Sequence, residues 1–246
     1  MLARVYYICA YWVSWAFFGA GGLGLNAVCA VLLLLPGRER RAPLVRETIR
    51  RLFVCWVGWL DAARLIRVTW SGREGGSLPR RTVYVANHPG LMDATLLLAR
   101  IPDAICIFKP SLIRNPFLGS AAVLAGYASG DSGVDLVRTL AQKAASGCSV
   151  LIFPEGTRTD HGAALNPLKP GFAIIARRAA VPVQILVIRS DREFLPRGRS
   201  WWRVPRLPVR IDVRVDQLLP ADPDRTVEAT VQSAERAFFG CLAHPL

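Results

Sequence analysis

The feature that most constrains this chain is an uncharged stretch near its N-terminus. No Asp, Glu, Lys or Arg occurs in the 33 residues from Val5 to Gly37, whereas about 20 apolar residues are enough to cross a bilayer. We therefore predict that residues 1–43 form a membrane anchor. The glycines at its centre, from Gly19 to Gly24, are poor helix formers, so a re-entrant hairpin is an alternative to a single tilted transmembrane helix.

Charges at the two ends of this stretch predict its orientation. Arg4 alone precedes the apolar run, whereas Arg38, Arg40 and Arg41 follow it directly. Because Lys and Arg are enriched in cytoplasmic loops, we expect the rest of the chain to face the cytoplasm at a bacterial inner membrane. A cleaved signal peptide would have a shorter apolar run and a basic start, and is the poorer interpretation.

Composition restricts the partners of the chain. It has 31 Lys and Arg residues against 18 Asp and Glu residues, and 52% of its residues are hydrophobic, a combination that favours an anionic lipid surface. There is no zinc-finger spacing and no RRM-like aromatic motif, so nucleic acid is not an expected partner. The three histidines and six cysteines show neither HExxH nor CxxC spacing, which argues against a metal site and for reduced thiols.

Basic and large apolar residues alternate in residues 44–70, for example at Arg46, Arg50, Trp56 and Trp59. The apolar runs here are too short to span a bilayer. We therefore predict one or two interfacial amphipathic helices, with their tryptophans at the level of the lipid headgroups. An ordinary amphipathic helix that packs on the following domain is the alternative.

After a polar, glycine-rich linker at residues 71–78, short β-type runs alternate with segments of helix length. This alternation predicts that residues 71–246 form one catalytic α/β domain, with a mixed, mostly parallel sheet flanked by helices. Strands are predicted at residues 82–86, 104–108, 149–153, 183–188 and 209–215, and helices at residues 91–100, 134–146, 169–180 and 226–239.

The first candidate for chemistry is the segment NHPGLMD at residues 87–93, which follows a predicted strand and opens a helix. Pro89 and Gly90 supply a turn that lets His88 on the loop meet Asp93 in the first helical turn. An Asp bonded to one imidazole nitrogen leaves the other nitrogen free to take a proton from an alcohol. We predict that His88 is a general base oriented by Asp93; a capped turn with an incidental histidine is the alternative.

The second candidate is the segment FPEGTR at residues 153–158, which ends another predicted strand. In α/β proteins, ligands bind where strands end in loops. Gly156 lets the backbone approach a ligand closely, and Arg158 offers a planar fork that matches phosphate oxygens. Glu155 is a candidate to orient Arg158 or to bond a substrate hydroxyl, with a plain loop ion pair as the alternative.

Together, these two segments, about 65 residues apart, resemble the glycerolipid acyltransferases of the PlsC type, which include the lysophosphatidate acyltransferases. The segments KPSL at residues 109–112 and VPV at residues 181–183 are similar to further motifs of that family, so the resemblance covers about residues 80–190.

The resemblance implies a membrane-bound enzyme of phospholipid biosynthesis. In that family His88, activated by Asp93, would let the hydroxyl of lysophosphatidic acid or a related lysophospholipid attack the thioester of acyl-CoA or acyl carrier protein directly. No cofactor is implied beyond that acyl donor. The substrate-binding residues that the resemblance implies are Asn87, Lys109, Glu155, Gly156, Thr157 and Arg158.

One departure from the family leaves the acceptor open. Members that take a glycerol phosphate usually carry an arginine just after the third strand, but residues 127–131 contain none. Arg114 and Arg138 are candidate substitutes, or the acceptor differs from a simple lysophosphatidate. The segment WWRVP at residues 201–205 is similar to PlsC-like proteins associated with bacterial aryl-polyene lipid synthesis, which provides an alternative with a non-standard acceptor.

Arginines surround Trp201 and Trp202 between Arg189 and Arg210. Arginines next to amphipathic aromatic rings suit an anionic headgroup layer. An ordinary solvated loop is one alternative, and a docking site for an acidic acyl carrier protein is another.

Two other functions compete with acyl transfer. The segment GDSG at residues 130–133 follows His88 and Asp93 in the chain order of a trypsin-like serine protease, with Ser132 as the nucleophile. That fold consists of two β-barrels, which the predicted α/β alternation disfavours, and Ser132 is better explained as a helix cap. A non-enzymatic membrane adaptor is the second rival, and it predicts that His88 can be replaced without loss of function.

Overall fold

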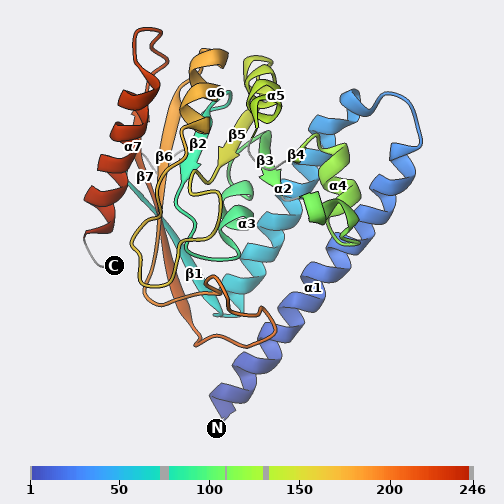
Figure 1. Cartoon of the computed structure of the whole chain (residues 1–246). Helices are drawn as coiled ribbons and strands as arrows, with labels where there is room; N and C mark the ends of the chain where they lie inside the picture. Colours follow the sequence, from blue (N-terminus) through green and yellow to red (C-terminus); the bar gives the residue numbers. More distant parts are fainter. Residues whose placement is uncertain (1, 73–77, 109, 130–132, 244–246) are drawn as a thin grey trace.

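The computed structural model describes residues 2–72, 78–108, 110–129 and 133–243. Within them, a seven-stranded sheet lies between two layers of helices (Figure 1). The strands are β1 (Ile66–Gly72), β2 (Val83–Ala86), β3 (Ala104–Phe108), β4 (Ala128–Ser129), β5 (Ser149–Ile152), β6 (Val183–Ser190) and β7 (Val209–Leu219). The helices are α1 (Leu2–Leu33), α2 (Arg38–Ala62), α3 (Asp93–Leu98), the 3₁₀ helix η1 (Pro110–Arg114), α4 (Gly119–Leu124), α5 (Val134–Ala145), α6 (Gly171–Ala179) and α7 (Val227–Leu242).

The sheet is mixed and mostly parallel, as the sequence predicts. The strand order is β1-β7-β6-β2-β5-β3-β4. Only β6 and β7 pair in the antiparallel sense, and every other neighbouring pair is parallel. The central strand β2 lies between β6 and β5, so its carboxyl end meets the carboxyl ends of both neighbours at one edge of the sheet.

Side chains of the central strands divide between two cores because successive residues of a strand point to opposite faces. Val83 and Val85 of β2 join the core beneath α5, α6 and α7. Tyr84 and Ala86 join the core on the other face, beneath α2 and α3. All four are completely buried, which explains why the strand is apolar throughout rather than alternating.

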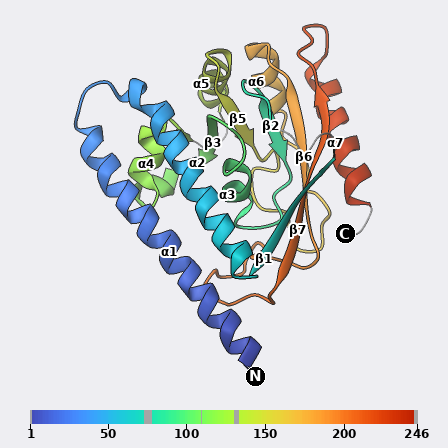
Figure 2. The same ribbon diagram turned by 180° about the vertical axis from the view of Figure 1, so that it is seen from behind.

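Helix α1 is continuous and lies along the outside of α2 and α4 (Figures 1 and 2). The predicted alternative of a re-entrant hairpin within residues 5–37 is therefore wrong. Its glycines serve close packing: a Cβ added at Gly22 would lie 2.9 Å from the carbonyl oxygen of Phe117, and one at Gly19 would lie 3.6 Å from the Phe117 ring. Neighbouring protein thus compensates for their poor helix propensity.

The predicted interfacial segment at residues 44–70 differs from the structure at both ends. Helix α2 begins earlier, at Arg38, and residues 66–70 form part of β1. Arg46 is buried rather than lipid-facing, and it bonds Asp103 at 2.6 Å and the Ala125 carbonyl at 2.8 Å. Trp56 is also buried. The alternative of an amphipathic helix packed on the domain is therefore correct for this face of α2.

The other predicted elements match the structure to within a few residues at each end, but four elements are missing from the prediction: β1, β4, η1 and α4. Of these, β4 is two residues long and η1 and α4 are each too short to show a helical period. Ser71 and Gly72, assigned to the linker, end β1, and residues 73–77 lie outside the described residues.

Candidate active site

The two motifs meet because they follow neighbouring parallel strands. The segment NHPGLMD begins where β2 ends, and FPEGTR begins where β5 ends. β2 and β5 pair directly, with Val85 opposite Ile152. The carboxyl ends of parallel strands lie at the same edge of the sheet, so residues 65 positions apart in the chain share one site.

His88 and Asp93 form the predicted pair. The Nδ1–H of His88 donates to Oδ2 of Asp93 at 2.9 Å, with His88 in the loop and Asp93 as the first residue of α3. The backbone N–H of Gly90 donates to the same oxygen at 2.7 Å. On its other side the imidazole stacks on Phe153, with 4.1 Å between the ring centroids and 20° between the planes. The ring is therefore held in one orientation, with Nε2 directed away from Asp93.

Burial dominates the electrostatics of Asp93. Its side chain is only 5% exposed, against 19% for His88. This burial raises the pKa of Asp93 above its ordinary value, while the hydrogen bonds from His88 and Gly90 and the charge of Arg158 oppose the rise. These donors stabilise the ionised form of the buried carboxylate. As a hydrogen-bond acceptor, the carboxylate in turn keeps the imidazole proton of His88 on Nδ1.

Glu155 and Asn87 lie differently from the prediction that they bind substrate. Glu155 is buried, and its carboxylate accepts from the backbone N–H of His88 at 2.8 Å, the Thr159 hydroxyl at 3.0 Å and the backbone N–H of Asn166 at 2.9 Å. Glu155 therefore forms no ion pair with Arg158, and both of its carboxylate oxygens already accept hydrogen bonds. Glu155 instead ties the FPEGTR loop to the His88 backbone.

Asn87 has a similar structural role. Its side chain is buried and exchanges two hydrogen bonds with the backbone of Ile188, at 2.9 Å and 2.7 Å. This contact continues the pairing of β2 and β6 by one residue and fixes the point at which the chain leaves the sheet. His88 therefore projects from a defined strand end.

A cavity of about 880 Å³ opens beside His88. Gly156, Thr157 and Arg158 line it together with His88, so the two motifs share a common pocket. Lys109, the remaining predicted binding residue, lies outside the described residues. Away from His88 the wall is mostly apolar and is formed by residues of α1, α2, α3, α4, α5 and α6, among them Phe18, Leu25, Phe53, Leu98, Ala122, Leu140 and Ile175.

Lys169 is a cation of this cavity that the sequence analysis missed. It precedes α6, is exposed, and lines the cavity with Arg158. A Cβ at Gly156 would come within 2.6 Å of the Lys169 ammonium nitrogen, so a side chain at this position would displace the ammonium group. Within the described part of the chain, no carboxylate lies within ion-pair distance of Lys169. The signal missed was the lysine twelve residues after Thr157, at the start of a predicted helix.

Arg114 and Arg138, the candidate substitutes from the sequence, do not line this cavity. Arg197 does line it and pairs with Asp160. Arg138 points outward and pairs with Asp135 at 3.0 Å. Arg114 is exposed at the end of η1. Arg158 itself donates from Nη1 to the carbonyls of Leu195 and Pro196, both at 3.0 Å, so one edge of its guanidinium is held by the loop that follows β6.

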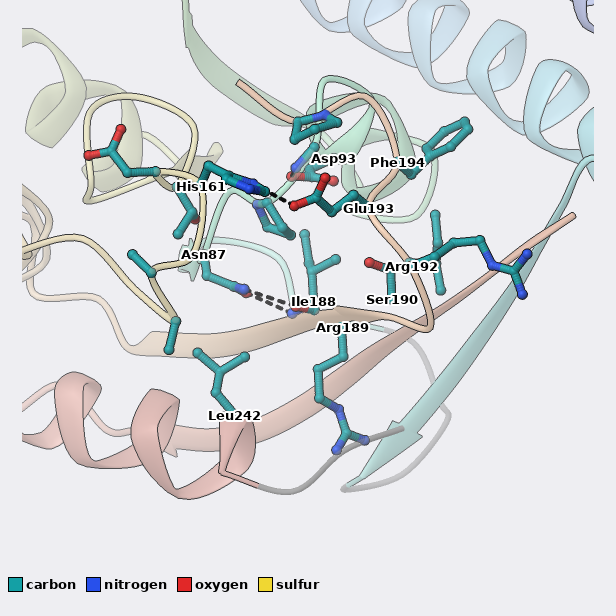
Figure 3. A pocket seen from close by; sticks show the side chains of 18 of the residues that line it. Asn87, Asp93, His161, Ile188, Arg189, Ser190, Arg192, Glu193, Phe194 and Leu242 are labelled. Atoms are coloured by element: carbon teal, nitrogen blue, oxygen red, sulfur yellow. Dashed lines mark hydrogen bonds and ion pairs between the residues drawn. The ribbon is translucent and has the colours of Figure 1, made fainter. Parts of the chain in front are cut away.

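A second, more polar cavity of about 430 Å³ lies behind the NHPGLMD loop. Figure 3 shows Asn87 facing Ile188 and His161 facing Glu193 across this cavity. Asp93 lines this second cavity, whereas His88 lines the first. The exposed His161 pairs with Glu193 at 2.7 Å and joins the loop after β5 to the loop after β6.

The described residues exclude the trypsin-like alternative, because they form one α/β sheet rather than two β-barrels. Ser132 lies outside the described residues, and α5 begins after Gly133 without a side-chain cap. The fold and the site together define an α/β protein that carries a histidine–carboxylate pair and cationic side chains where its parallel strands end.

Comparison with known proteins makes this assignment specific. The sequence model of the Acyltransferase family matches residues 67–189, half of the chain. A lyso-ornithine lipid O-acyltransferase from Pseudomonas aeruginosa is 33% identical over 73% of this chain and 67% of its own length. A chloroplastic 1-acyl-sn-glycerol-3-phosphate acyltransferase from Brassica napus is 28% identical over 71% of this chain and 53% of its own length. The chain therefore belongs to the Acyltransferase family.

The fold has a solved counterpart of nearly the same extent. The crystal structure of the 1-acyl-sn-glycerophosphate acyltransferase PlsC from Thermotoga maritima matches with a TM-score of 0.71 over 98% of this chain and 95% of that chain, at 20% sequence identity. The predicted PlsC-type resemblance is thus confirmed for the family and for the fold. The chain spans about half the length of the first two curated relatives.

Proposed function

We propose that the chain is a membrane-bound O-acyltransferase that moves a fatty acyl group from acyl-CoA or acyl carrier protein to the hydroxyl of lysophosphatidic acid or a related lyso-lipid. The observation that carries the proposal is the cavity that joins the His88–Asp93 pair to Arg158 and Lys169 at one end and to an apolar wall at the other. A lyso-lipid acceptor and an acyl thioester each combine an anionic or polar head with an apolar chain, which suits such a cavity.

The chemistry follows from the orientation of His88. Because Asp93 accepts from Nδ1, Nε2 is the free base that removes the proton from the acceptor hydroxyl. The hydroxyl oxygen then attacks the thioester carbonyl carbon and forms the ester bond. When the carbon–sulfur bond breaks, the leaving thiolate takes the proton back from the His88 imidazolium. No covalent enzyme intermediate or cofactor is needed in this sequence.

Cations at the cavity mouth support an acceptor with an anionic head. Arg158 presents its guanidinium and Lys169 its ammonium group on the same wall as His88, and charge-assisted bonds to phosphate are among the strongest hydrogen bonds. Replacement of Arg158 by alanine is expected to weaken acceptor use by about 2 kcal/mol. Residues 127–131 contain no arginine, and the other Lys and Arg side chains that line the cavity among the described residues are Lys169 and Arg197, the latter paired with Asp160.

A lyso-ornithine lipid is the alternative acceptor. The relative with 33% identity is named for that substrate. An arginine fork binds a carboxylate as well as it binds a phosphate, so the same site is compatible with either head. The acyl donor, acyl-CoA or acyl carrier protein, is left to the assay.

Membrane attachment through α1 is part of the proposal. α1 is the described helix that is long and apolar enough to cross a bilayer. Contacts with the domain occur along most of its length: Tyr6 bonds the Ala63 carbonyl at 2.9 Å, Trp15 packs on Trp56, and Asn26 accepts from the Ala121 N–H at 3.0 Å. A perpendicular α1 would draw charged loops of the domain into the hydrocarbon.

We therefore infer that α1 lies along the membrane surface with its outer face in the lipid. That face is apolar and exposed at Leu2, Val5, Ile8, Trp12, Val13, Phe17, Leu23, Val28 and Val31. An exposed apolar strip of this length marks a lipid or protein contact. The arginines at Arg38, Arg40 and Arg41 favour the cytoplasmic face of an anionic bilayer.

The test uses purified protein in detergent with an acyl-CoA or acyl-ACP donor and a panel of lyso-lipid acceptors, with products identified by mass spectrometry. We expect ester formation with wild-type protein and a loss of about a thousandfold or more for His88→Ala, since a general base contributes up to about 10⁴-fold. His161→Ala is the matched control, because His161 is exposed and lies outside the main cavity. Full activity of His88→Ala would instead support the adaptor alternative.

A further inference from the structure

The connection between β6 and β7 is unusually long for a link between paired antiparallel strands. It runs over residues 191–208, here called the strap, whereas hairpin loops usually have two to five residues. Loops of this length in a compact domain generally have a function of their own. The strap is ordered by contacts at both of its ends, and these contacts involve different parts of the molecule.

The first half of the strap lies over the active site. The Leu195 carbonyl accepts from the Leu91 N–H at 3.1 Å and, together with the Pro196 carbonyl, from Arg158. Leu195 is completely buried and has a φ of +52°. Such a backbone conformation is unfavourable for a leucine and persists only where the surroundings impose it. Here it accompanies two consecutive carbonyls that both accept from the Arg158 guanidinium.

The second half of the strap is docked on α1. The Trp201 ring packs against Trp15 with 5.1 Å between centroids and against Trp12 with 6.1 Å. The Tyr11 hydroxyl also donates to the Trp201 carbonyl. The neighbouring Trp202 contacts the Trp201 ring instead, and the residue is 56% exposed.

Only four residues, 197–200, separate the two attachments, and the chain here is folded into tight turns. The Arg199 N–H donates to the Pro196 carbonyl at 3.2 Å, and the Arg203 N–H donates to the Ser200 carbonyl at 3.1 Å. A short, turn-rich segment transmits a displacement of one end to the other, because it has little slack to absorb it. The position of the Arg158 guanidinium is therefore linked to the position of α1.

We propose that Trp201 is a positioning residue that acts through the strap: anchored on α1, it holds the Leu195 and Pro196 carbonyls that orient Arg158 toward the head of the acceptor. This inference rests on the proposed function for its kinetic part. It couples acceptor recognition to the seating of α1 in the bilayer, so that the enzyme binds its acceptor best when the helix is properly placed.

The test compares Trp201→Ala with Trp202→Ala and Trp201→Phe in detergent, using lysophosphatidic acid and a long-chain acyl-CoA. We expect Trp201→Ala to raise the acceptor KM about tenfold, the size of one charge-assisted hydrogen bond, with kcat and the donor KM little changed. Trp202→Ala should match wild-type protein, and Trp201→Phe should recover most of the loss because a ring still packs on Trp15. A merely structural role would lower kcat and the melting temperature together.

A double mutant shows whether the effect passes through Arg158. If it does, Trp201→Ala adds nothing to the acceptor KM in an Arg158→Ala background, since coupled residues are not additive. Equal effects of Trp201→Ala in both backgrounds would overturn the inference.

A measurement that needs no activity separates this inference from the proposed function. The Leu91 N–H bonds the strap, so its hydrogen exchange should quicken in Trp201→Ala and stay unchanged in Trp202→Ala. Unchanged Leu91 exchange in Trp201→Ala would overturn the coupling whatever the enzyme does. Failure of wild-type protein to acylate any acceptor would overturn the proposed function, while the exchange data would still decide the coupling.

Discussion

Two buried carboxylates at the site differ in the groups that donate hydrogen bonds to them. Asp93 and Glu155 are each 4% exposed. Asp93 accepts from an imidazole that borders the cavity, whereas Glu155 accepts from two backbone N–H groups and a hydroxyl. The same functional group therefore orients an imidazole in one place and fastens two loops together in the other. Sequence motifs do not distinguish these roles, because both residues are acids within five positions of a candidate functional side chain.

The role of Glu155 predicts the result of Glu155→Gln. A glutamine has one acceptor oxygen, and its NH₂ group would face the N–H of His88 or of Asn166. Since an unsatisfied buried donor costs about 1–3 kcal/mol, we expect a loss of that size in unfolding free energy and a lower kcat from a displaced His88. Thermal unfolding and steady-state kinetics measure the two effects. A variant with wild-type stability and only a raised acceptor KM would show that Glu155 binds substrate after all.

The raised pKa of Asp93 predicts a pH dependence of stability. The folded protein holds this proton at pH values where the unfolded chain, with the ordinary pKa of 3.8, has released it. The contribution of Asp93 to stability is therefore complete below that ordinary pKa and is lost as the pH rises through the raised value. Relative to Asp93→Asn, which cannot titrate, wild-type protein should become less stable as the pH rises above about 4. Melting temperatures of the two proteins, measured in detergent at increasing pH, test this sign. A wild-type protein that gains stability relative to Asp93→Asn as the pH rises would refute it.

At the scale of elements, α1 is the helix whose composition is least typical of a water-soluble protein. It combines an exposed apolar face with a stripe of buried or half-buried residues that recur every three or four positions, at Ala10, Ser14, Phe18, Gly22, Asn26 and Cys29. The stripe contains small and polar residues because α4 and α2 approach closely there, as Gly22 against Phe117 and Asn26 against Ala121 show.

Two glycines of α1 give a matched pair of variants. A methyl group at Gly22 would meet the Phe117 carbonyl at 2.9 Å, whereas nothing lies within 4 Å of one at Gly24. Gly22→Ala is expected to destabilise the protein by about 1–3 kcal/mol through overpacking. Gly24→Ala should instead gain up to about 1 kcal/mol of helix propensity. Melting temperatures that move in the same direction for both variants would contradict the close packing of α1 on α4.

At the scale of the whole molecule, the exposed apolar face of α1 and the candidate active site belong to one body. Residues of α1 and α2 line the same cavity as His88, so the predicted anchor also forms part of the candidate site. The predicted division of the chain at residues 43 and 70 treats the anchor as a separate segment. A separate anchor would not provide this wall of the cavity. Under the proposed function, this arrangement would let an acceptor in the bilayer reach His88.

The surface orientation of α1 predicts where its two ends lie. A helix of 32 residues is about 48 Å long and could cross a bilayer. If α1 lies along the surface instead, Leu2→Cys and Leu35→Cys react with a membrane-impermeant maleimide from the same side of reconstituted vesicles. The experiment uses a background in which the exposed Cys9 and Cys55 are serine. Labelling of the two positions from opposite sides would establish a transmembrane helix.

Much of the fold could be predicted from local pattern. The runs that became β2, β3, β5, β6 and β7 are apolar and bounded by turn residues, and the meeting of His88 with Asp93 follows from the Pro89-Gly90 turn between them. Strand β1 was missed because its residues, Ile66–Gly72, follow directly on an arginine- and tryptophan-rich helix with the same composition. The segment forms a strand because it pairs in parallel with β7. This pairing depends on the assembled sheet rather than on the residues of β1.

The sequence by itself determined most of the elements, the two motifs and the long apolar stretch near the N-terminus, because helix and strand periods, turn residues and hydropathy are properties of neighbouring residues. Only the tertiary structure decided which polar groups face the cavity. Glu155 and Asn87 are turned inward to satisfy buried backbone groups, Arg46 is drawn into the core by Asp103, and Lys169 is brought to the mouth beside Gly156. Each of these outcomes depends on a partner far away in the chain, and the free energy of leaving such a partner unsatisfied is set by burial, which sequence distance does not reveal.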